Sequence, residues 1–256
     1  MSMSWSRLSL SAALLATAPA YAEPPQGGLA TAVFSDYVWR GALATRGPVS
    51  QSSVDVEWSG VMFRVWQNMD LTSDRNLFGK ISEVDYDLSY TKAVHQFDVS
   101  AGTVRYTYPH AGARATTELY MGATAHGWLN PSVRAYFGVG SAHGAYLTVD
   151  MLHRFAFPSG SVRTFEGLDL SAGAGWGSSS YHRAYFGVAR SGLSDLRPAA
   201  ALPVHITRSL RLVPTLAWSM MLDPRLRRSP SAFHGFIVGA TLSARICPNR
   251  TLLCSR

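Results

Sequence analysis

Long hydrophobic runs are missing from the body of this chain of 256 residues, lysine occurs only twice, and cysteine is absent before residue 247. After residue 22 no stretch of about 18 or more apolar residues occurs, which argues against transmembrane helices. Charge is also scarce, since 15% of the residues are charged and 47% are hydrophobic. Any membrane span of this chain must therefore be made of strands.

The first 22 residues differ from the rest and predict a signal peptide that is cleaved before Glu23. Arg7 supplies a positive charge, residues 8–18 are apolar or small, and Ala20-Tyr21-Ala22 matches the small-x-small pattern of a cleavage site. The alternative is a short N-terminal helix that stays attached. We expect an exported protein with a mature body that starts at residue 23.

Cysteine is absent until Cys247 and Cys254, close to the end of the sequence. Two cysteines are too few for a zinc site, but in an oxidising compartment they can close a small disulfide loop. A P-loop, His-Glu-x-x-His and Gly-x-Ser-x-Gly are missing as well. We therefore expect no cofactor, no metal and no enzymatic activity.

One local candidate for hydrolysis of lipid is His182, which follows the serines of residues 178–180. It would need a nucleophile and further partners at the lipid interface, and the sequence does not supply them clearly. The glycine-rich segment 173–177 has no predicted helix after it, so it indicates close packing or a bend rather than nucleotide binding.

The positive charge is almost entirely arginine, because Lys80 and Lys92 stand against 21 arginines. Residues 23–150 carry 9 basic and 12 acidic side chains, whereas residues 151–256 carry 13 and 4. Guanidinium groups pair bidentately with phosphate and carboxylate, so lipid, including lipopolysaccharide, or an anionic solute fits this bias. Nucleic acid is not an expected partner of an exported chain. The alternative is that these arginines are scattered and solvated on loops.

The segment Glu83–Tyr90 shows most clearly how the chain is built. Side chains of a strand point alternately to two faces, so the three carboxylates Glu83, Asp85 and Asp87 share one face, and the other face is apolar. Carboxylates cannot line a dry core without partners. We expect lipid to cover the apolar face and the carboxylates to face water.

About thirteen segments of roughly ten residues repeat this alternation, each long enough to cross an apolar band of about 25 Å when tilted. They lie at residues 28–41, 54–58, 61–68, 83–90, 97–108, 118–125, 133–139, 145–151, 168–176, 182–190, 199–206, 210–218 and 236–244. Longer polar stretches such as 71–80 alternate with tight turns such as Ser59-Gly60. This is typical of outer-membrane barrels.

We predict an all-β fold: a closed, antiparallel, up-and-down transmembrane β-barrel over residues 23–246, located in the outer membrane and followed by a short tail at 247–256. A soluble barrel or sandwich would carry many lysines on its outer polar face, and this chain has two. Bacterial single-chain barrels have even strand numbers, so we expect twelve strands. The surplus segment is assigned to 199–218, as one bent strand or one segment outside the wall.

The first predicted strand, Gly28–Gly41, ends with Tyr37 and Trp39 on its apolar face. Aromatic residues in such a place favour the membrane-water interface. Asp36 and Arg40 fall on the opposite face, where they can join charges in the lumen.

Charged residues on the polar faces give a set of predicted pore-lining positions. They are Asp36, Arg40, Asp55, Glu57, Arg64, Glu83, Asp85, Asp87, Glu118, Arg134, Asp150, Arg183 and Arg211. Acidic and basic walls facing each other would select solutes by charge and dipole. The alternative is that these charges pair and close a narrow lumen.

Two families resemble parts of this chain. Val33-Phe-Ser-Asp-Tyr-Val-Trp-Arg-Gly41, followed by Gln51, Trp66-Gln67-Asn68, Tyr106-Thr-Tyr-Pro109 and Glu118-Leu-Tyr120, resembles the TorF-type porin family, also called Gcw_chp, over residues 29–155. Tyr185-Phe-Gly-Val188, Ser191-Gly-Leu-Ser194, Asp223 and Ser229-Pro230 in the last third resemble the MipA/OmpV family. Such barrels usually end on an aromatic residue, whereas this chain continues past Ile246 into the tail.

Both resemblances imply an outer-membrane barrel without catalytic residues, but they imply different functions. The first implies a small porin or channel for small polar or charged solutes, and this is the function we expect. The second implies a scaffold that binds a murein-processing enzyme, such as a murein hydrolase, and it is kept as the alternative.

Overall fold

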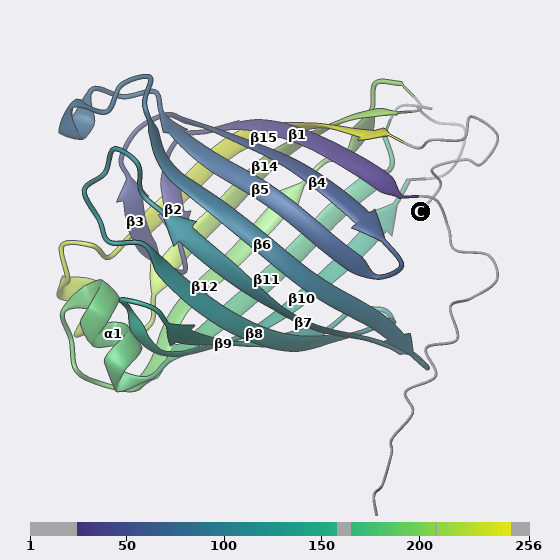
Figure 1. Ribbon diagram of the computed structural model, residues 1–256. Coiled ribbons are helices and arrows are strands. Elements are labelled where there is room, and N and C mark those ends of the chain that lie inside the picture. The colour runs from purple at the N-terminus through teal and green to yellow at the C-terminus, as the bar shows by residue number, and fades with distance from the viewer. Residues whose placement is uncertain (1–24, 158–164, 208, 247–256) are drawn as a thin grey trace, which may run out of the picture.

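The computed structural model describes residues 25–157, 165–207 and 209–246, and their strands form one closed antiparallel barrel of twelve strands (Figure 1). Each strand of the wall pairs with its neighbour along the chain, and β1 pairs with β15 to close the ring. The wall strands are β1 (Gln26–Phe34), β4 (Val49–Trp58), β5 (Val61–Asp70), β6 (Ile81–Val94), β7 (Phe97–Thr107), β8 (Thr116–Ala125), β9 (Ser132–Val139), β10 (His143–Ala156), β11 (Gly167–Gly177), β12 (Gly192–Ala201), β14 (Leu210–Met221) and β15 (His234–Ile246). The predicted fold class and strand number are confirmed.

Six shorter elements lie outside this ring or at its rim. They are β2 (Tyr37–Trp39), β3 (Ala42–Thr45), β13 (Val204–His205), α1 (Ser179–Phe186) and the 3₁₀ turns η1 (Asp74–Asn76) and η2 (Leu226–Arg228). Within the described residues no helix is long and apolar enough to cross a membrane.

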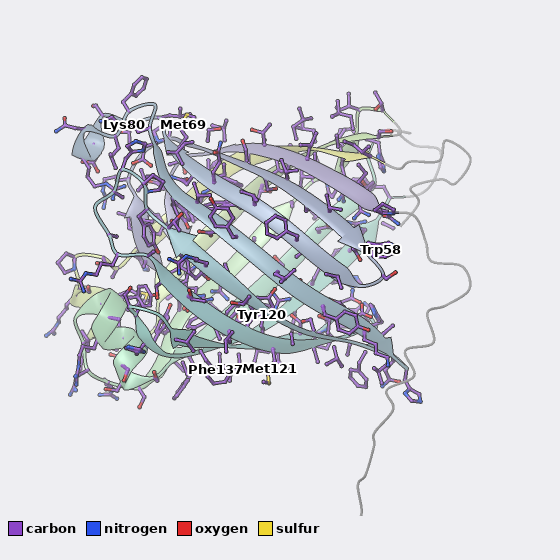
Figure 2. The ribbon with its side chains drawn as sticks, in the orientation of Figure 1. Trp58, Met69, Lys80, Tyr120, Met121 and Phe137 are labelled. Atoms are coloured by element: carbon purple, nitrogen blue, oxygen red, sulfur yellow. The ribbon has the colours of Figure 1, made fainter. Side chains whose placement is uncertain are left out.

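The outer surface of the barrel is apolar on all twelve strands. Tyr86, Leu88 and Tyr90 of β6 are 43% to 50% exposed, while Glu83 on the inner face is buried. Every strand adds at least one large exposed apolar side chain, for example Leu29, Val56, Phe63, Leu88, Val99, Met121, Phe137, Val149, Leu170, Leu193, Leu216 and Val238. In Figure 2 the labelled Met121 and Phe137 lie along one outer side of the wall. A belt this large calls for lipid rather than water around it.

Aromatic side chains border the apolar belt at both ends. Trp58, Tyr90 and Phe155 are exposed near the end where β1 starts and β15 stops, and Trp176 and Phe236 are exposed near the other end. Aromatic girdles of this kind mark the two interfaces of an outer-membrane barrel. The apolar belt, the girdles and the closed sheet together place the chain in an outer membrane.

The two ends of the barrel differ in their connections. At the turn end, where β1 starts and β15 stops, Ser59-Gly60 and His95-Gln96 join strands by two residues each. At the opposite loop end, the connections 35–48, 71–80, 178–191 and 222–233 are longer and hold the short helices and the β2–β3 hairpin (Figure 1). Outer-membrane barrels have short periplasmic turns and longer extracellular loops, so we assign the loop end to the extracellular side.

The surplus strand was assigned to the wrong segment. Residues 182–190 are not a strand, because α1 covers their first half: Ser178 accepts a hydrogen bond from the Tyr181 backbone N–H as N-cap, and Gly187 ends the helix with φ 71°. Residues 199–218, in contrast, contain two wall strands, β12 and β14. A helix was missed because the segment's apolar residues also fit a period of two.

A β-bulge hides strand β12 from a period-two pattern. Ala174 pairs with Leu196 and Trp176 pairs with Leu193, so two residues, Ser194 and Asp195, stand opposite Gly175. The extra residue shifts the alternation in the middle of the strand. Asp195 thereby points inward and is fully buried.

The chain after β1 turns into the barrel, which corrects the prediction for Tyr37 and Trp39. Strands β2 and β3 form a hairpin apart from the wall, with Arg40 and Gly41 at its tip in positive-φ conformations of 48° and 79°. Tyr37 is buried with its ring centroid 5.5 Å from that of Trp66, and the ring centroid of Trp39 lies 5.8 Å from that of Tyr106. These rings therefore fill the lumen and do not face the membrane interface.

Candidate functional site

Arg40 at the hairpin tip is held by the most enclosed ion pair of the described residues. Its two terminal nitrogens donate to the Glu118 carboxylate at 3.0 and 2.9 Å, and the Tyr106 hydroxyl donates to the same carboxylate at 2.9 Å. The side chains of Arg40 and Glu118 are 8% and 4% exposed. The guanidinium also lies 3.9 to 4.5 Å from three ring centroids, those of Trp39, Tyr136 and Tyr146. This set of contacts fixes the hairpin inside the lumen.

The hairpin packs against other loop-end elements to form an apolar core within the barrel. Tyr185 of α1 lies 5.0 Å from Trp39. Buried residues from the wall, α1 and the β14–β15 loop complete this cluster: Tyr146, Tyr181, Phe186, Met221 and Leu226. The backbone of residues 231–233 also bonds to the hairpin at Leu43 and Gly41. The loop-end half of the lumen is thus filled by packed protein.

The buried carboxylate of Asp195 ties this core to the wall. Asp195 accepts from the Tyr146 hydroxyl at 3.0 Å and pairs with Arg197 at 2.8 Å. Arg197 reaches on to Thr148 at 2.8 Å and to Asp150 at 3.3 Å. Gly175 lies directly below this group, where a Cβ would come within 2.5 Å of Asp195. The glycine-rich segment therefore serves close packing, as expected from the sequence.

Asp70 makes the corresponding link at the base of the hairpin. Its fully buried carboxylate accepts from Thr45 at 3.0 Å, from Asn68 at 2.9 Å and from Ser82 at 2.8 Å. Arg75 of the 71–80 loop adds an ion pair at 3.1 Å. These bonds join β3, the wall and the loop, so the hairpin is anchored at its base as well as at its tip.

Below the hairpin tip lies a small cavity of about 230 Å³, which we call the hairpin chamber. The tip residues Trp39 and Arg40 form its roof, and the inner faces of β5 to β9 form its wall. The wall contributes Arg64, Trp66, Asp85, Asp87, Tyr106, Tyr120, Arg134 and Tyr136. Both signs of charge thus meet in one chamber rich in aromatic rings.

A larger cavity of about 630 Å³ occupies the turn-end half, and we call it the vestibule. Asp55 and Glu57 of β4 line one side, and Arg64 lines both cavities. Facing them, Glu166 binds Arg154 at 3.0 Å and Arg211 at 2.6 Å. The side chains of Arg154 and Arg211 are 42% and 35% exposed, so these ion pairs are in contact with water, unlike the pair at the hairpin tip.

The structure distributes the thirteen predicted pore-lining residues over four places. The hairpin chamber takes Arg40, Arg64, Asp85, Asp87 and Arg134, and the vestibule takes Asp55, Glu57, Arg64 and Arg211. Glu83 and Glu118 are buried in the wall, and Asp150 pairs with Arg197. Asp36 and Arg183 lie elsewhere. A role in lining an open pore stays a prediction for all of them.

Asp36 and Arg183 are named in the lining of neither cavity. The Asp36 carboxylate accepts the Gly47 backbone N–H at 3.0 Å and fastens the base of the hairpin. Arg183 is exposed on α1 and lines neither cavity, because its segment is a helix at the loop end and not a strand. Cys247, Cys254 and the predicted signal peptide lie outside the described residues.

The sequence missed Arg154, Glu166, Asp195 and Arg197. Arg197 and Asp195 were hidden by the bulge in β12, and Glu166 lies outside every predicted strand. Arg154 lies three residues beyond the predicted strand 145–151, on the face of Thr148 and Asp150 if the alternation continues. That was the one signal available in the sequence.

His182 and Ser178 have structural partners instead of each other. His182 is buried, and its Nδ1 bonds to the Arg190 carbonyl. Burial lowers the pKa of His182 below its ordinary value, although the bond to Arg190 acts in the opposite direction. The Ser178 hydroxyl accepts from the backbone N–H groups of Ala145 and Tyr181 at 2.9 and 3.3 Å. The geometry of a nucleophile activated by a base is therefore not formed by these two residues.

These observations define the class of the protein as a transmembrane β-barrel of the outer-membrane type with an inward-folded hairpin. No family model and no curated sequence matches the chain. Among solved structures, the NanC porin matches with a TM-score of 0.52 and 12% identity over 85% of this chain and 97% of that one. The KdgM porin matches with 0.48 and 9% over 86% and 98%, and outer membrane phospholipase A from Escherichia coli with 0.44 and 14% over 86% and 92%.

At these identities the likeness shows the fold alone, and the match to the NanC porin, whose TM-score is above 0.5, supports it. The chain has the fold of small outer-membrane porins. The resemblances to the TorF-type and MipA/OmpV families stay predictions.

Proposed function

We propose that this protein is a channel for small polar or charged solutes in the outer membrane, with the β2–β3 hairpin as its narrowest part. The observation that carries the proposal is the charged interior: the vestibule and the hairpin chamber both border Arg64, one behind the other along the barrel. Charged side chains that line a water-contacting cavity keep their hydration, and pores use such linings to select solutes. They are expected in a path for polar solutes.

The small volume of the hairpin chamber and the fixed tip set the expected conductance. At about 230 Å³ the chamber admits a small solute but not a large one. The Arg40–Glu118 pair holds the hairpin over it. We therefore expect a low conductance that rises when this pair is broken.

Planar-bilayer recordings of the purified protein test the proposal. Wild type should give small, discrete conductance steps, and Arg40→Ala should give larger steps, because the hairpin loses its attachment at the tip. Arg183→Ala is the matched control, since Arg183 is exposed on α1 outside both cavities. Silence of both wild type and Arg40→Ala would rule the channel out.

The scaffold role and the hydrolase role give different results in parallel measurements. A murein hydrolase recovered with a non-conducting barrel would favour the scaffold. Lipid hydrolysis that is lost in His182→Ala would favour an enzyme, although the contacts of His182 are against it. We expect neither recovery of a murein hydrolase with a non-conducting barrel nor lipid hydrolysis that depends on His182.

A further inference from the structure

We propose that the hairpin chamber binds a small zwitterion with a protonated amine and a carboxylate, the chemistry of a free amino acid. The inference deepens the proposed channel function and rests on it. Two groups in the chamber wall carry it: among the described residues, the Asp85 Oδ1 and the Arg64 Nε are buried and have no hydrogen-bond partner. The Asp85 oxygen needs a hydrogen-bond donor, and the Arg64 N–H needs a hydrogen-bond acceptor.

The two groups lie side by side on one inner face. Arg64 pairs in register with Asp87, and Asp85 pairs with Trp66, so Arg64 and Asp85 are diagonal neighbours on adjacent strands. Diagonal neighbours of this kind are about 7–8 Å apart at their backbones, which long side chains bridge easily. A ligand that carries its amine and its carboxylate on the same carbon can reach both groups at once.

The other charges that line the chamber already have partners. Asp87 accepts from the Tyr120 hydroxyl at 2.7 Å, and Arg40 is paired with Glu118. Arg134 lies 5.3 Å from the Tyr120 ring centroid and donates to Tyr136 at 3.4 Å.

The nearest carboxylate to the Arg64 Nε outside the chamber is that of Asp55. The two groups are 3.8 Å apart, beyond hydrogen-bond distance. The Asp85 and Arg64 sites therefore stay available to a solute.

The surroundings favour a cationic group at Asp85. Glu83 lies on the same face two residues away and is buried, so an amine at Asp85 has a second carboxyl group nearby. Aromatic rings line the rest of the chamber, and rings attract a cation over their faces. The guanidinium of Arg40, 3.9 Å from the centroid of Tyr136, shows that these rings do accommodate one.

The size of the chamber limits the ligand. Sites for drug-sized molecules have volumes of about 300–1,000 Å³. A chamber of about 230 Å³ is smaller and fits a single amino acid, whereas an oligosaccharide or a peptide would not fit under the hairpin.

Calorimetric titration of the purified full-length protein in detergent tests the proposal with three matched probes. L-valine carries both charges, isobutylamine lacks the carboxylate, and isovalerate lacks the amine. We expect valine to bind at least about tenfold more tightly than either fragment, because each fragment leaves either the Asp85 Oδ1 or the Arg64 Nε without a hydrogen-bond partner. Equal binding of valine and one fragment would overturn the two-charge site.

Two variants that each remove one charge assign the charges. Asp85→Asn should weaken valine and isobutylamine by about tenfold and leave isovalerate unchanged, and Arg64→Gln should weaken valine and isovalerate and leave isobutylamine unchanged. Asp98→Asn and Arg105→Gln are the matched controls, one at the turn end paired with His126 and one exposed on the outer face. Wild-type affinities in both chamber variants would overturn the site.

Recordings on the same samples separate this inference from the channel. Conductance without valine binding would overturn the binding site and leave the channel standing. Valine binding with no conductance would overturn the channel and leave the site standing. Partial block of the current by valine, weakened in Asp85→Asn, is the result expected if both hold.

Discussion

The loop-end half of the lumen is packed like the interior of a soluble domain, whereas the turn-end half holds a charged, water-contacting vestibule. Arg40 and Glu118 in the first half are 8% and 4% exposed, and Arg154 and Glu166 in the second are 42% and 18% exposed. The same twelve strands bound both halves. The two halves differ in what fills the lumen, because the hairpin and α1 pack in the loop-end half and do not reach the turn-end half.

This difference separates two tasks within one fold. Alternation in the strands makes an apolar outer wall along the whole barrel, and it leaves polar groups inside. Loops then decide which of these groups are removed from water. An arginine–glutamate ion pair is thus packed away from water near the hairpin, as in Arg40–Glu118, and is in contact with water in the vestibule, as in Arg154–Glu166.

The largest expected effect compares those two ion pairs directly. Arg40→Ala leaves the Glu118 carboxylate buried without its cation, which should reduce the free energy of unfolding by about 3–5 kcal/mol. Arg154→Ala breaks exposed pairs and should cost about 1 kcal/mol or less. Urea unfolding in lipid vesicles, followed by tryptophan fluorescence, measures both. Equal losses would show that the two halves do not differ in burial as described.

A double variant distinguishes loss of charge from loss of packing. Arg40→Met with Glu118→Leu removes both charges and keeps apolar volume, so it should recover most of the stability lost in Arg40→Ala. It should still conduct more than wild type, because the hydrogen bonds that hold the tip are gone.

The second prediction concerns the fit of the hairpin tip. Gly41 has φ 79°, and a Cβ there would lie 2.8 Å from the Asp195 Cβ and would also collide with the Met221 sulfur. Gly41→Ala should therefore cost about 2–3 kcal/mol, from overpacking and left-handed strain together. Gly187→Ala is the control, since its φ is 71° but its Cβ would meet nothing within 4 Å, and it should cost about 1 kcal/mol. The same unfolding assay applies, and similar costs would mean that the tip is not tightly packed.

The sequence predicted the barrel because strand alternation is a local property. Tyr86, Leu88 and Tyr90 could be assigned to the outer face from their spacing alone, and the structure agrees. The same rule failed where a longer-range contact decides the path of the chain. Tyr37 and Trp39 continue the alternation of β1, but the chain bends after Phe34 and buries both rings against the wall.

The candidate site was predictable in part for the same reason. Asp85 and Asp87 could be assigned to the inner face, but nothing local indicated that Arg40 would reach Glu118, 78 residues away. Asp195 and Arg197 were hidden because the bulge opposite Gly175 breaks the period of two. The contents of the lumen depend on pairings between distant segments, which a single sequence does not reveal.

The third prediction uses pH to act on one half only. The pKa of His182 in α1 is lowered by burial, so the folded protein binds this proton less readily than the unfolded chain. Stability is therefore unaffected well above the ordinary histidine pKa of about 6.5 and falls as the pH drops below it, by at most about 1.4 kcal/mol per pH unit. Urea midpoints measured from pH 7.5 to 5 should fall more in wild type than in His182→Gln. If the urea midpoints of wild type and His182→Gln fell equally with pH, His182 would not be the cause of the pH dependence.

The smallest expected effect lies in the vestibule, where charges are solvated. Four arginines and three carboxylates line it, so wild type should show weak selectivity between small ions. Asp55→Asn with Glu57→Gln should shift permeability toward anions, and Arg211→Gln with Arg245→Gln should shift it toward cations.

A charge about 4 Å from an ion contributes about 1 kcal/mol in water, which is about a fivefold change in permeability ratio at most. The shifts should largely vanish in 1 M salt, where screening acts over about 3 Å, because these groups are in contact with the solution. Reversal potentials under a salt gradient measure this, and a shift that persists at high salt would place the vestibule charges in a dry, narrow passage like the one below the hairpin.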